Sequence, residues 1–218
     1  MKILVFSDVH GSLNSLKSLI SSDYYKNADK VIFLGDAVMG FSRPNECVEL
    51  LKDMKCECVI GNNDYYICNN TYCESFDDLK MNQLNYMKMI VSRNSIDIMK
   101  SWEKYLYLNI DDKRFCFLHY VWKDNDVFEI PKNINRQNRE KMFANIDADY
   151  IVFGHEHVTS FFEGEGKKYW CVGSIGLNNL GKYLLIDVHD GKIEIEEKEI
   201  EFDMDEEINL REKANYPF

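Results

Sequence analysis

The first sixty residues alternate short apolar runs with longer segments of helical periodicity, and this rhythm limits the folds that the chain can adopt. The apolar runs at residues 2–6, 30–34 and 56–60 have the length and hydrophobicity of buried strands. Between them, residues 13–20 and 44–54 repeat apolar side chains every three or four positions, as one face of a helix does. This β-α-β-α-β order predicts adjacent parallel strands joined by right-handed crossovers.

The rest of the chain favours a different arrangement. Residues 65–106 have a loose helical pattern rich in Asn and Met, which predicts a helical, lid-like segment. Residues 132–146 are polar and predict a surface helix. Asp190-Gly191 is a strong hairpin signal, and we expect mostly strands around it, at residues 114–118, 150–153, 161–162, 169–172, 183–188 and 192–200. Because no repeat or Pro/Gly/Ser-rich linker divides the sequence, we expect a single domain over residues 1–218.

Composition excludes several classes of function. The net charge of −11 argues against general nucleic-acid binding, because such proteins neutralise phosphates with Lys and Arg. No segment approaches eighteen consecutive apolar residues, so we expect no membrane association. Seven scattered cysteines without an N-terminal secretion signal favour reduced thiols and a cytoplasmic location. Cys56 and Cys58 could bind a metal, but their position in a predicted strand favours a core role.

Polar side chains that can bind metals directly follow the predicted strands. Carboxylate, carboxamide and imidazole groups together supply the mixed oxygen and nitrogen shell that Mn²⁺, Fe or Zn²⁺ accept. Side chains at strand ends can converge on one rim of a sheet from distant parts of the chain. In chain order, the candidate metal ligands are Asp8, His10, Asp36, Asn62, His119, His155 and His157.

In this order, the candidates resemble the calcineurin-like metallophosphoesterase superfamily. The pattern comprises Asp-x-His beginning at Asp8, Gly-Asp ending at Asp36, Gly-Asn-x-Asp at residues 61–64, the lone His119, and Gly-His-x-His ending at His157. The similarity covers roughly residues 1–190, and three flanking segments add to it: residues 7–13, residues 35–51, which look like a bacterial subgroup of phosphoesterases, and residues 172–177.

The resemblance implies an α/β fold of two packed mixed β-sheets flanked by helices. It also implies two divalent ions, with Mn²⁺ expected and Fe, Zn²⁺ or Ni²⁺ as alternatives. By the family pattern Asp36 bridges the ions, while the first is completed by Asp8, His10 and His157 and the second by Asn62, His119 and His155. In extended backbone, residues two apart project to the same side. We therefore expect His10 to project beside Asp8 and His157 beside His155, with Glu156 turned away.

The function that the resemblance implies is metal-dependent hydrolysis of small phosphodiesters or phosphomonoesters, by attack of a hydroxide that bridges the two ions. Two alternatives stay open. One is a serine/threonine-type protein phosphatase. The other is a non-catalytic protein-binding scaffold on the same fold, similar to the small subunit of the retromer coat. The sequence carries no signal for oligomeric state.

One position departs from the family pattern. Many members carry a histidine, a proposed general acid, where this chain has Asn63, and an amide cannot donate a proton to a leaving group at neutral pH. The departure favours diesters or activated esters. Asn63 could instead donate a hydrogen bond to substrate, and Asp64 could orient a metal ligand. Together with Asp36 these are the candidate catalytic residues, although Asn63 and Asp64 could equally only shape a turn.

Several further residues have two interpretations each. Arg43 could clamp a substrate phosphate or serve on the surface. His189 is expected to be an exposed turn residue, and residues 194–207 a solvated acidic strand and tail. Four aromatic residues follow candidate metal ligands closely in the sequence: Tyr65, Tyr66, Tyr120 and Trp122. They could stack on a flat substrate group, although core packing is favoured.

Overall fold

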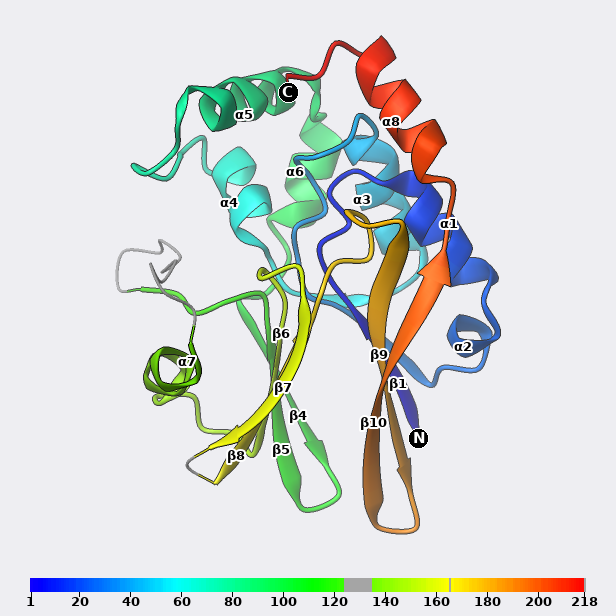
Figure 1. Ribbon diagram of the computed structural model, residues 1–218, viewed down its shortest axis with the longest axis vertical. Coiled ribbons are helices and arrows are strands. Elements are labelled where there is room, and N and C mark those ends of the chain that lie inside the picture. The colour runs from blue at the N-terminus through cyan, green and yellow to red at the C-terminus, as the bar shows by residue number, and fades with distance from the viewer. Residues whose placement is uncertain (124–134, 165, 218) are drawn as a thin grey trace.

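The computed structural model describes residues 1–123, 135–164 and 166–217. Within this part of the chain, two mixed five-stranded sheets pack together and helices flank them (Figure 1). The first sheet has the strand order β10-β9-β1-β2-β3 and comprises β1 Lys2–Phe6, β2 Lys30–Phe33, β3 Glu57–Cys58, β9 Leu180–His189 and β10 Lys192–Glu201. The second has the order β4-β5-β6-β8-β7 and comprises β4 Tyr105–Ile110, β5 Lys113–Leu118, β6 Tyr150–Phe153, β7 Thr159–Gly164 and β8 Lys167–Val172.

The helices form two groups. Those of the first half and the C-terminal helix gather above and beside the first sheet, whereas α7 lies against the second (Figure 1). In the described residues they are α1 Leu13–Ser21, α2 Asp23–Lys26, α3 Pro44–Asp53, α4 Asn62–Cys68, α5 Asp78–Ile90, α6 Arg93–Met99, α7 Arg136–Phe143 and α8 Met204–Lys213. None of them is long and apolar enough to cross a bilayer.

The first strand shows why the early apolar runs have no polar face. Ile3 and Val5 belong to the core between the two sheets, whereas Leu4 and Phe6 belong to the core beneath the helices. A strand buried on both faces must be apolar at every position, which produces the short continuous run seen in the sequence.

The parallel strands bring distant loops together. β1 pairs with β2 and β2 with β3 in parallel, as the β-α-β-α-β rhythm predicts. In the second sheet, β5, β6 and β8 are also parallel. The loop after β1 bonds to the loop after β2 through Asp8 N–H and the carbonyl of Gly35 at 2.9 Å. The loop after β6 bonds to the loop after β5 through Gly154 N–H and the carbonyl of His119 at 3.0 Å. The strand ends therefore meet along one edge of the sandwich.

Two of the secondary-structure predictions were wrong in extent. The third strand is reduced to Glu57–Cys58 with one further bridge at Val59, because β3 is the edge of its sheet. Residues 65–106 contain α5, α6 and most of α4, but residues 105 and 106 already belong to β4. This strand alternates, with Leu106 and Leu108 packed on the inter-sheet core and Tyr107 exposed. The predicted helix over residues 132–146 is observed as α7, and residues 132–134 lie outside the described part of the chain.

The acidic segment at residues 194–207 was predicted as a solvated strand and tail, and only the strand is confirmed. Residues 192–201 form the exposed edge strand β10, but α8 follows it and buries Glu207 completely. Glu207 Oε1 accepts hydrogen bonds from Asn14 N–H at 2.7 Å, Arg43 Nη2 at 2.6 Å and Ser12 Oγ at 3.3 Å. The charge of Arg43 and the two neutral donors explain how a carboxylate is buried here.

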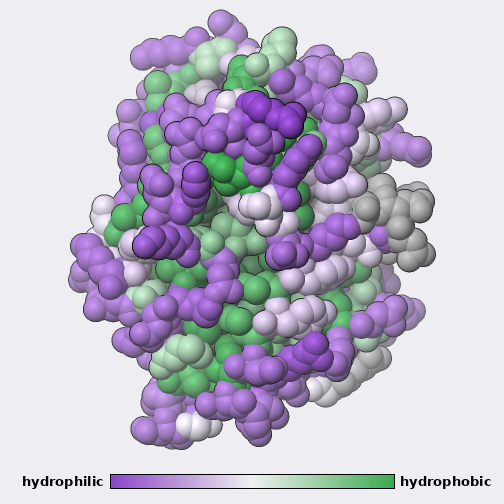
Figure 2. Space-filling model, turned by 180° about the vertical axis from the view of Figure 1, so that it is seen from behind, coloured by the Kyte–Doolittle hydropathy of each residue, from purple (hydrophilic) through white to green (hydrophobic). Residues whose placement is uncertain are grey.

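Cys56 and Cys58 lie at the edge of the first sheet. They are half-buried and line a pocket of about 420 Å³ together with Trp102 and Leu106. Among the described residues, neither cysteine belongs to a group of three side chains close enough to hold an ion. All seven cysteines are free thiols. On the face opposite to that of Figure 1, hydrophobic patches lie among hydrophilic side chains in the central and lower parts (Figure 2).

Candidate metal centre

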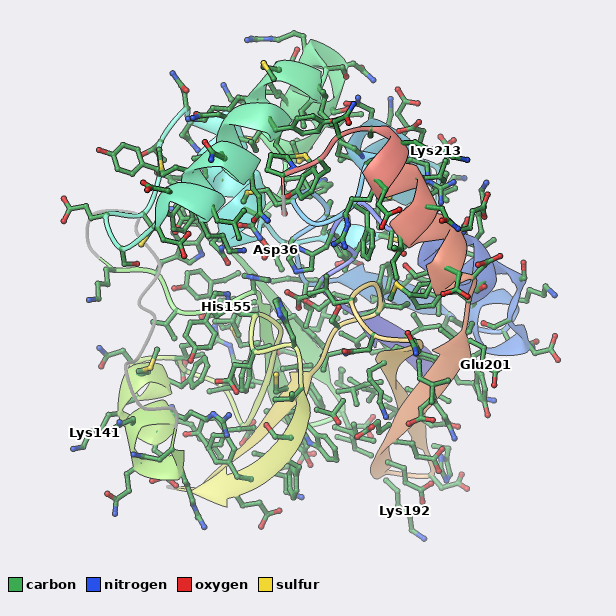
Figure 3. All side chains as sticks on the ribbon, turned by 45° about the horizontal axis from the view of Figure 1, so that its top comes forward. Asp36, Lys141, His155, Lys192, Glu201 and Lys213 are labelled. Atoms are coloured by element: carbon green, nitrogen blue, oxygen red, sulfur yellow. The ribbon has the colours of Figure 1, made fainter. Side chains whose placement is uncertain are left out.

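Seven polar side chains from five loops meet at the edge where the strands end. Asp36 and His155, which are labelled in Figure 3, lie between the helices and the strands of the second sheet. Two groups of possible ligands share Asp36, and within each group the ligand atoms all lie within 4.8 Å of one another. The first group contains Asp8, His10, Asp36 and His157, and the second contains Asp36, His119 and His155.

The first group surrounds an unpartnered carboxylate oxygen. Asp8 Oδ1 lies 3.3 Å from His157 Nε2 and 3.5 Å from His10 Nε2, yet it is buried and accepts no hydrogen bond. The other oxygen, Oδ2, accepts from His155 N–H at 3.0 Å. Because an unpaired buried carboxylate oxygen is costly, this arrangement suits a cation placed among these atoms. The carboxylate and two imidazoles fit Mn²⁺, Fe or Zn²⁺.

The second group gains a further oxygen from Asn62. Its Oδ1 lies 2.8 Å from His155 Nδ1 and 3.0 Å from His119 Nε2, and these two nitrogens are 3.3 Å apart. Asp36 Oδ2 lies 3.5 Å from His119 Nε2 and 3.9 Å from His10 Nε2, so one carboxylate oxygen reaches both groups. A ligand that bridges two ions must reach both of them, and this oxygen has the required position.

Backbone carbonyls orient two of the imidazoles. His10 Nδ1 lies 2.6 Å from the carbonyl oxygen of Met39, and His119 Nδ1 lies 2.7 Å from that of Leu34. Since a carbonyl can only accept, both Nδ1 atoms carry the proton, and the Nε2 atoms face the site. These two carbonyl partners could not be predicted from the sequence, because every residue has a backbone carbonyl.

The electrostatics of the site favour positive charge. Burial lowers the pKa of His119, but the carboxylates of Asp36 and Asp8 outweigh burial and raise this pKa to about 9. Burial likewise opposes ionisation of Asp8, yet the neighbouring histidines hold its pKa well below the usual range. Burial and the charge of His119 lower the pKa of His155 to about 4. Two buried carboxylates thus attract cationic partners, which a metal ion would replace.

Five of the seven predicted ligands adopt left-handed backbone conformations. The φ angles are 58° at Asp8, 53° at His10, 62° at Asp36, 72° at His155 and 59° at His157. The prediction that each ligand pair is extended was therefore wrong: the strands end before the ligands, and tight turns direct the side chains inward. Non-glycine residues seldom adopt this conformation, and such strain concentrates at functional sites. Glu156 does point away from both ligand groups, as predicted.

Glycines precede three of the ligands because neighbouring backbone and side-chain atoms leave no room for a Cβ. A Cβ on Gly61 would lie 2.2 Å from both the N and Oδ1 atoms of Asp36. A Cβ on Gly35 would lie 2.4 Å from Gly61 N, and one on Gly154 would lie 2.8 Å from Asp8 Oδ2. These contacts explain on steric grounds why glycine stands at the first position of the Gly-Asp, Gly-Asn and Gly-His pairs.

Asn63 and Asp64 contact the backbone and side chain of Asp36. Asn63 donates from its N–H and its Nδ2 to the two carboxylate oxygens of Asp36. Asp64 accepts from the N–H groups of Asp36 at 2.8 Å, Ala37 at 2.9 Å and Gly61 at 3.0 Å. Burial and the charge of Asp36 raise the pKa of Asp64 to about 7, although these N–H donors favour its ionised form.

The remaining candidates lie in varied surroundings. Arg43 donates to the buried Glu207. Tyr66 and Tyr120 are buried in the core, which agrees with the favoured packing role. Tyr65 and Trp122 are half-buried, with ring centroids 4.9 Å apart in an edge-to-face contact. His189 is exposed, as predicted, but it is the last residue of β9 rather than a turn residue.

Comparison with known families agrees with this geometry. The model of the calcineurin-like phosphoesterase superfamily domain matches residues 1–191, and the chain belongs to this superfamily.

Individual relatives extend the likeness over nearly the whole chain. The uncharacterized protein MJ0912 of Methanocaldococcus jannaschii is 28% identical over 185 residues, which are 84% of this chain and 73% of the relative. A metallophosphoesterase from Sphaerobacter thermophilus superposes with a TM-score of 0.79 at 20% identity, covering 100% of this chain and 95% of its own. The hypothetical protein PH1004 from Pyrococcus horikoshii superposes with a TM-score of 0.80 at 16% identity, covering 99% and 94%. At these identities the two structures show the fold.

Proposed function

We propose that this protein is a metal-dependent phosphoesterase that hydrolyses small phosphodiesters or phosphomonoesters, with water as the nucleophile. The observation that carries the proposal is the single oxygen, Asp36 Oδ2, that faces both ligand groups. Two divalent ions held there, with Mn²⁺ expected and Fe, Zn²⁺ or Ni²⁺ as alternatives, would lower the pKa of water and offset charge on the phosphoryl oxygens.

In this proposal, the side chains of the site hold the metal ions in position and do not donate a proton to the leaving group. Five of the seven ligands are fixed by tight turns, and carbonyl partners orient His10 and His119. Residue 63 is an amide bonded to Asp36, so it supplies no general acid. Departure of the leaving group is then easiest for activated esters and for diesters, whose single negative charge also needs less neutralisation.

The arginines support the same preference. A phosphomonoester dianion is commonly clamped by a bidentate guanidinium. All six arginines of the chain are described, and each already contacts a partner within the protein: Arg43 with Glu207, Arg93 with Asp97, Arg114 with Asp147, Arg136 with Glu140, Arg139 with Glu156, and Arg211 with the ring of Phe41. Because each arginine already has a partner, we expect the metal ions rather than a guanidinium to offset the charge of the substrate.

Turnover of three substrates with added Mn²⁺ tests the proposal. We expect kcat/KM for bis(p-nitrophenyl) phosphate to exceed that for p-nitrophenyl phosphate, and both to exceed that for a phosphopeptide. Asp36→Asn should abolish turnover of all three, whereas Asp97→Asn, an exposed carboxylate on α6, should leave it unchanged. A clear phosphopeptide preference would favour the protein-phosphatase alternative, and full activity of Asp36→Asn would exclude Asp36 as the bridging ligand.

A non-catalytic scaffold is the other alternative. It gives no reason to keep seven competent ligands, five of them with strained backbone, and the conformations of Asp8, His10 and Asp36 are costly unless they serve a site. A wild-type protein that binds Mn²⁺ but cleaves no phosphoester would favour the scaffold.

We also propose that α5 and α6, which pack with α4 behind Asn62 and Asn63, form a lid-like part of a single domain.

A further inference from the structure

Glu156 lies between two predicted metal ligands, His155 and His157, but its carboxylate points in the opposite direction. Only 1% of this side chain is exposed. Its carboxylate belongs to neither ligand group. A buried carboxylate between two imidazole ligands would be costly without strong partners, so its contacts show what holds this turn in place.

Two residues from other elements enclose the carboxylate. Arg139 of α7 donates from Nε to Glu156 Oε1 at 3.0 Å and from Nη2 to Oε2, which forms a bidentate pair. Tyr120 donates its hydroxyl to Glu156 Oε1 at 3.2 Å. The arginine side chain is only 15% exposed, so water screens the pair weakly.

The same three residues connect the turns that carry three ligands. Tyr120 directly follows His119, and its ring lies 4.6 Å from the ring of His155. Glu156 joins His155 to His157, both of which have left-handed backbone. A strained turn persists only when its surroundings fix it, and a bidentate pair anchored in a helix provides such a constraint.

We propose that Arg139, Glu156 and Tyr120 form a positioning clamp that couples α7 to the second ligand group and sets the geometry in which His119 and His155 bind metal. This proposal rests on the proposed metal-dependent function. It assigns Glu156 a specific role in this chain: the residue between the paired histidines anchors their turn to a helix outside the ligand loops. Partners of metal ligands typically change metal affinity by about 10–100-fold when they are removed.

Arg139→Gln is the direct test, with Arg136→Gln as the matched control. Arg136 lies on the same helix in an exposed pair with Glu140. Titration of the metal-free proteins with Mn²⁺ should show affinity reduced about tenfold or more in Arg139→Gln and unchanged in Arg136→Gln. Hydrogen exchange of the amides at residues 154–158, measured without metal, should accelerate only in Arg139→Gln. Equal Mn²⁺ affinity in Arg139→Gln and wild type would overturn the clamp, even if exchange accelerates.

Two further variants keep the test decisive. If Arg139→Gln does not fold, Arg139→Lys keeps the charge but loses the bidentate geometry, and it should still weaken Mn²⁺ binding. In a double-mutant cycle with Glu156→Gln, the two effects on affinity should be strongly non-additive, whereas independent effects would contradict the clamp. Phosphoesterase activity enters none of these readouts. Wild-type protein that binds Mn²⁺ without hydrolysing phosphoesters would therefore overturn the proposed function while the affinities still decide the clamp.

Discussion

Asn63 holds both carboxylate oxygens of Asp36. Its N–H donates to Oδ1 at 2.9 Å, and its carboxamide Nδ2 donates to Oδ2 at 2.7 Å. Oδ2 is the oxygen that reaches both ligand groups, so one residue fixes the rotamer of the proposed bridge. At the position where many relatives carry a proposed general acid, this chain has an amide that is hydrogen-bonded to the proposed bridging carboxylate.

Removing the carboxamide should loosen this carboxylate. Asn63→Ala keeps the N–H bond to Oδ1 but loses the bond to Oδ2, so we expect the free energy of unfolding of the metal-free protein to fall by about 1.5–3 kcal/mol. Mn²⁺ affinity should fall by about tenfold. Asn69→Ala, at the exposed C-terminal end of the same helix, is the control and should leave affinity unchanged. Denaturant unfolding and metal titration measure both effects, and unaltered affinity in Asn63→Ala would contradict the positioning role.

Gly61→Ala should damage the site through a steric clash. The added Cβ would lie 2.2 Å from Asp36 N and Oδ1, so the two loops must separate. Gly191→Ala is the matched control, because a Cβ there meets no atom within 4 Å, although its φ of 72° is unfavourable for alanine. We expect Gly61→Ala to lose Mn²⁺ binding and Gly191→Ala to keep it despite a cost of about 1 kcal/mol in stability. Mn²⁺ binding at wild-type strength in Gly61→Ala would show that the close approach is not needed.

Arg43 can be tested against its own partner. If Arg43 mainly anchors α8, then Arg43→Ala and Glu207→Ala should both lower the free energy of unfolding, by about 3–5 kcal/mol for loss of one partner of a buried pair. Neither variant should raise KM for bis(p-nitrophenyl) phosphate. A KM increase in Arg43→Ala that is absent from Glu207→Ala would instead support the phosphate clamp.

The stability of the metal-free protein should depend on pH through His119. Its pKa is raised to about 9, whereas an unfolded histidine titrates near about 6.5. A folded-state pKa above the unfolded one gives stabilisation that is complete below about pH 6.5 and is lost as pH rises through about 9. We therefore expect the free energy of unfolding to fall over this interval in EDTA-treated protein, and His119→Asn to flatten the slope. A slope of the opposite sign in the wild type would contradict the assignment.

The sequence predicted most of the features that local pattern determines. The buried strands ending at Phe6 and Phe33 have no polar face, and the order of Asp8, Asp36 and His119 carried the superfamily resemblance. The stretch containing β4 was missed because its half-buried alternation followed a helical region. The pairs formed by Arg139 with Glu156 and Arg43 with Glu207 were also missed, because they join residues far apart in the chain and no spacing encodes them.

Anomalous diffraction from crystals of the Mn²⁺-loaded protein would locate the ions themselves. We expect two peaks about 3.5–4 Å apart, one beside Asp8, His10 and His157 and the other beside Asn62, His119 and His155. The carboxylate of Asp36 should lie between them. The absence of any peak at these residues, or a single peak that Asp36 does not contact, would contradict a metal centre bridged by Asp36.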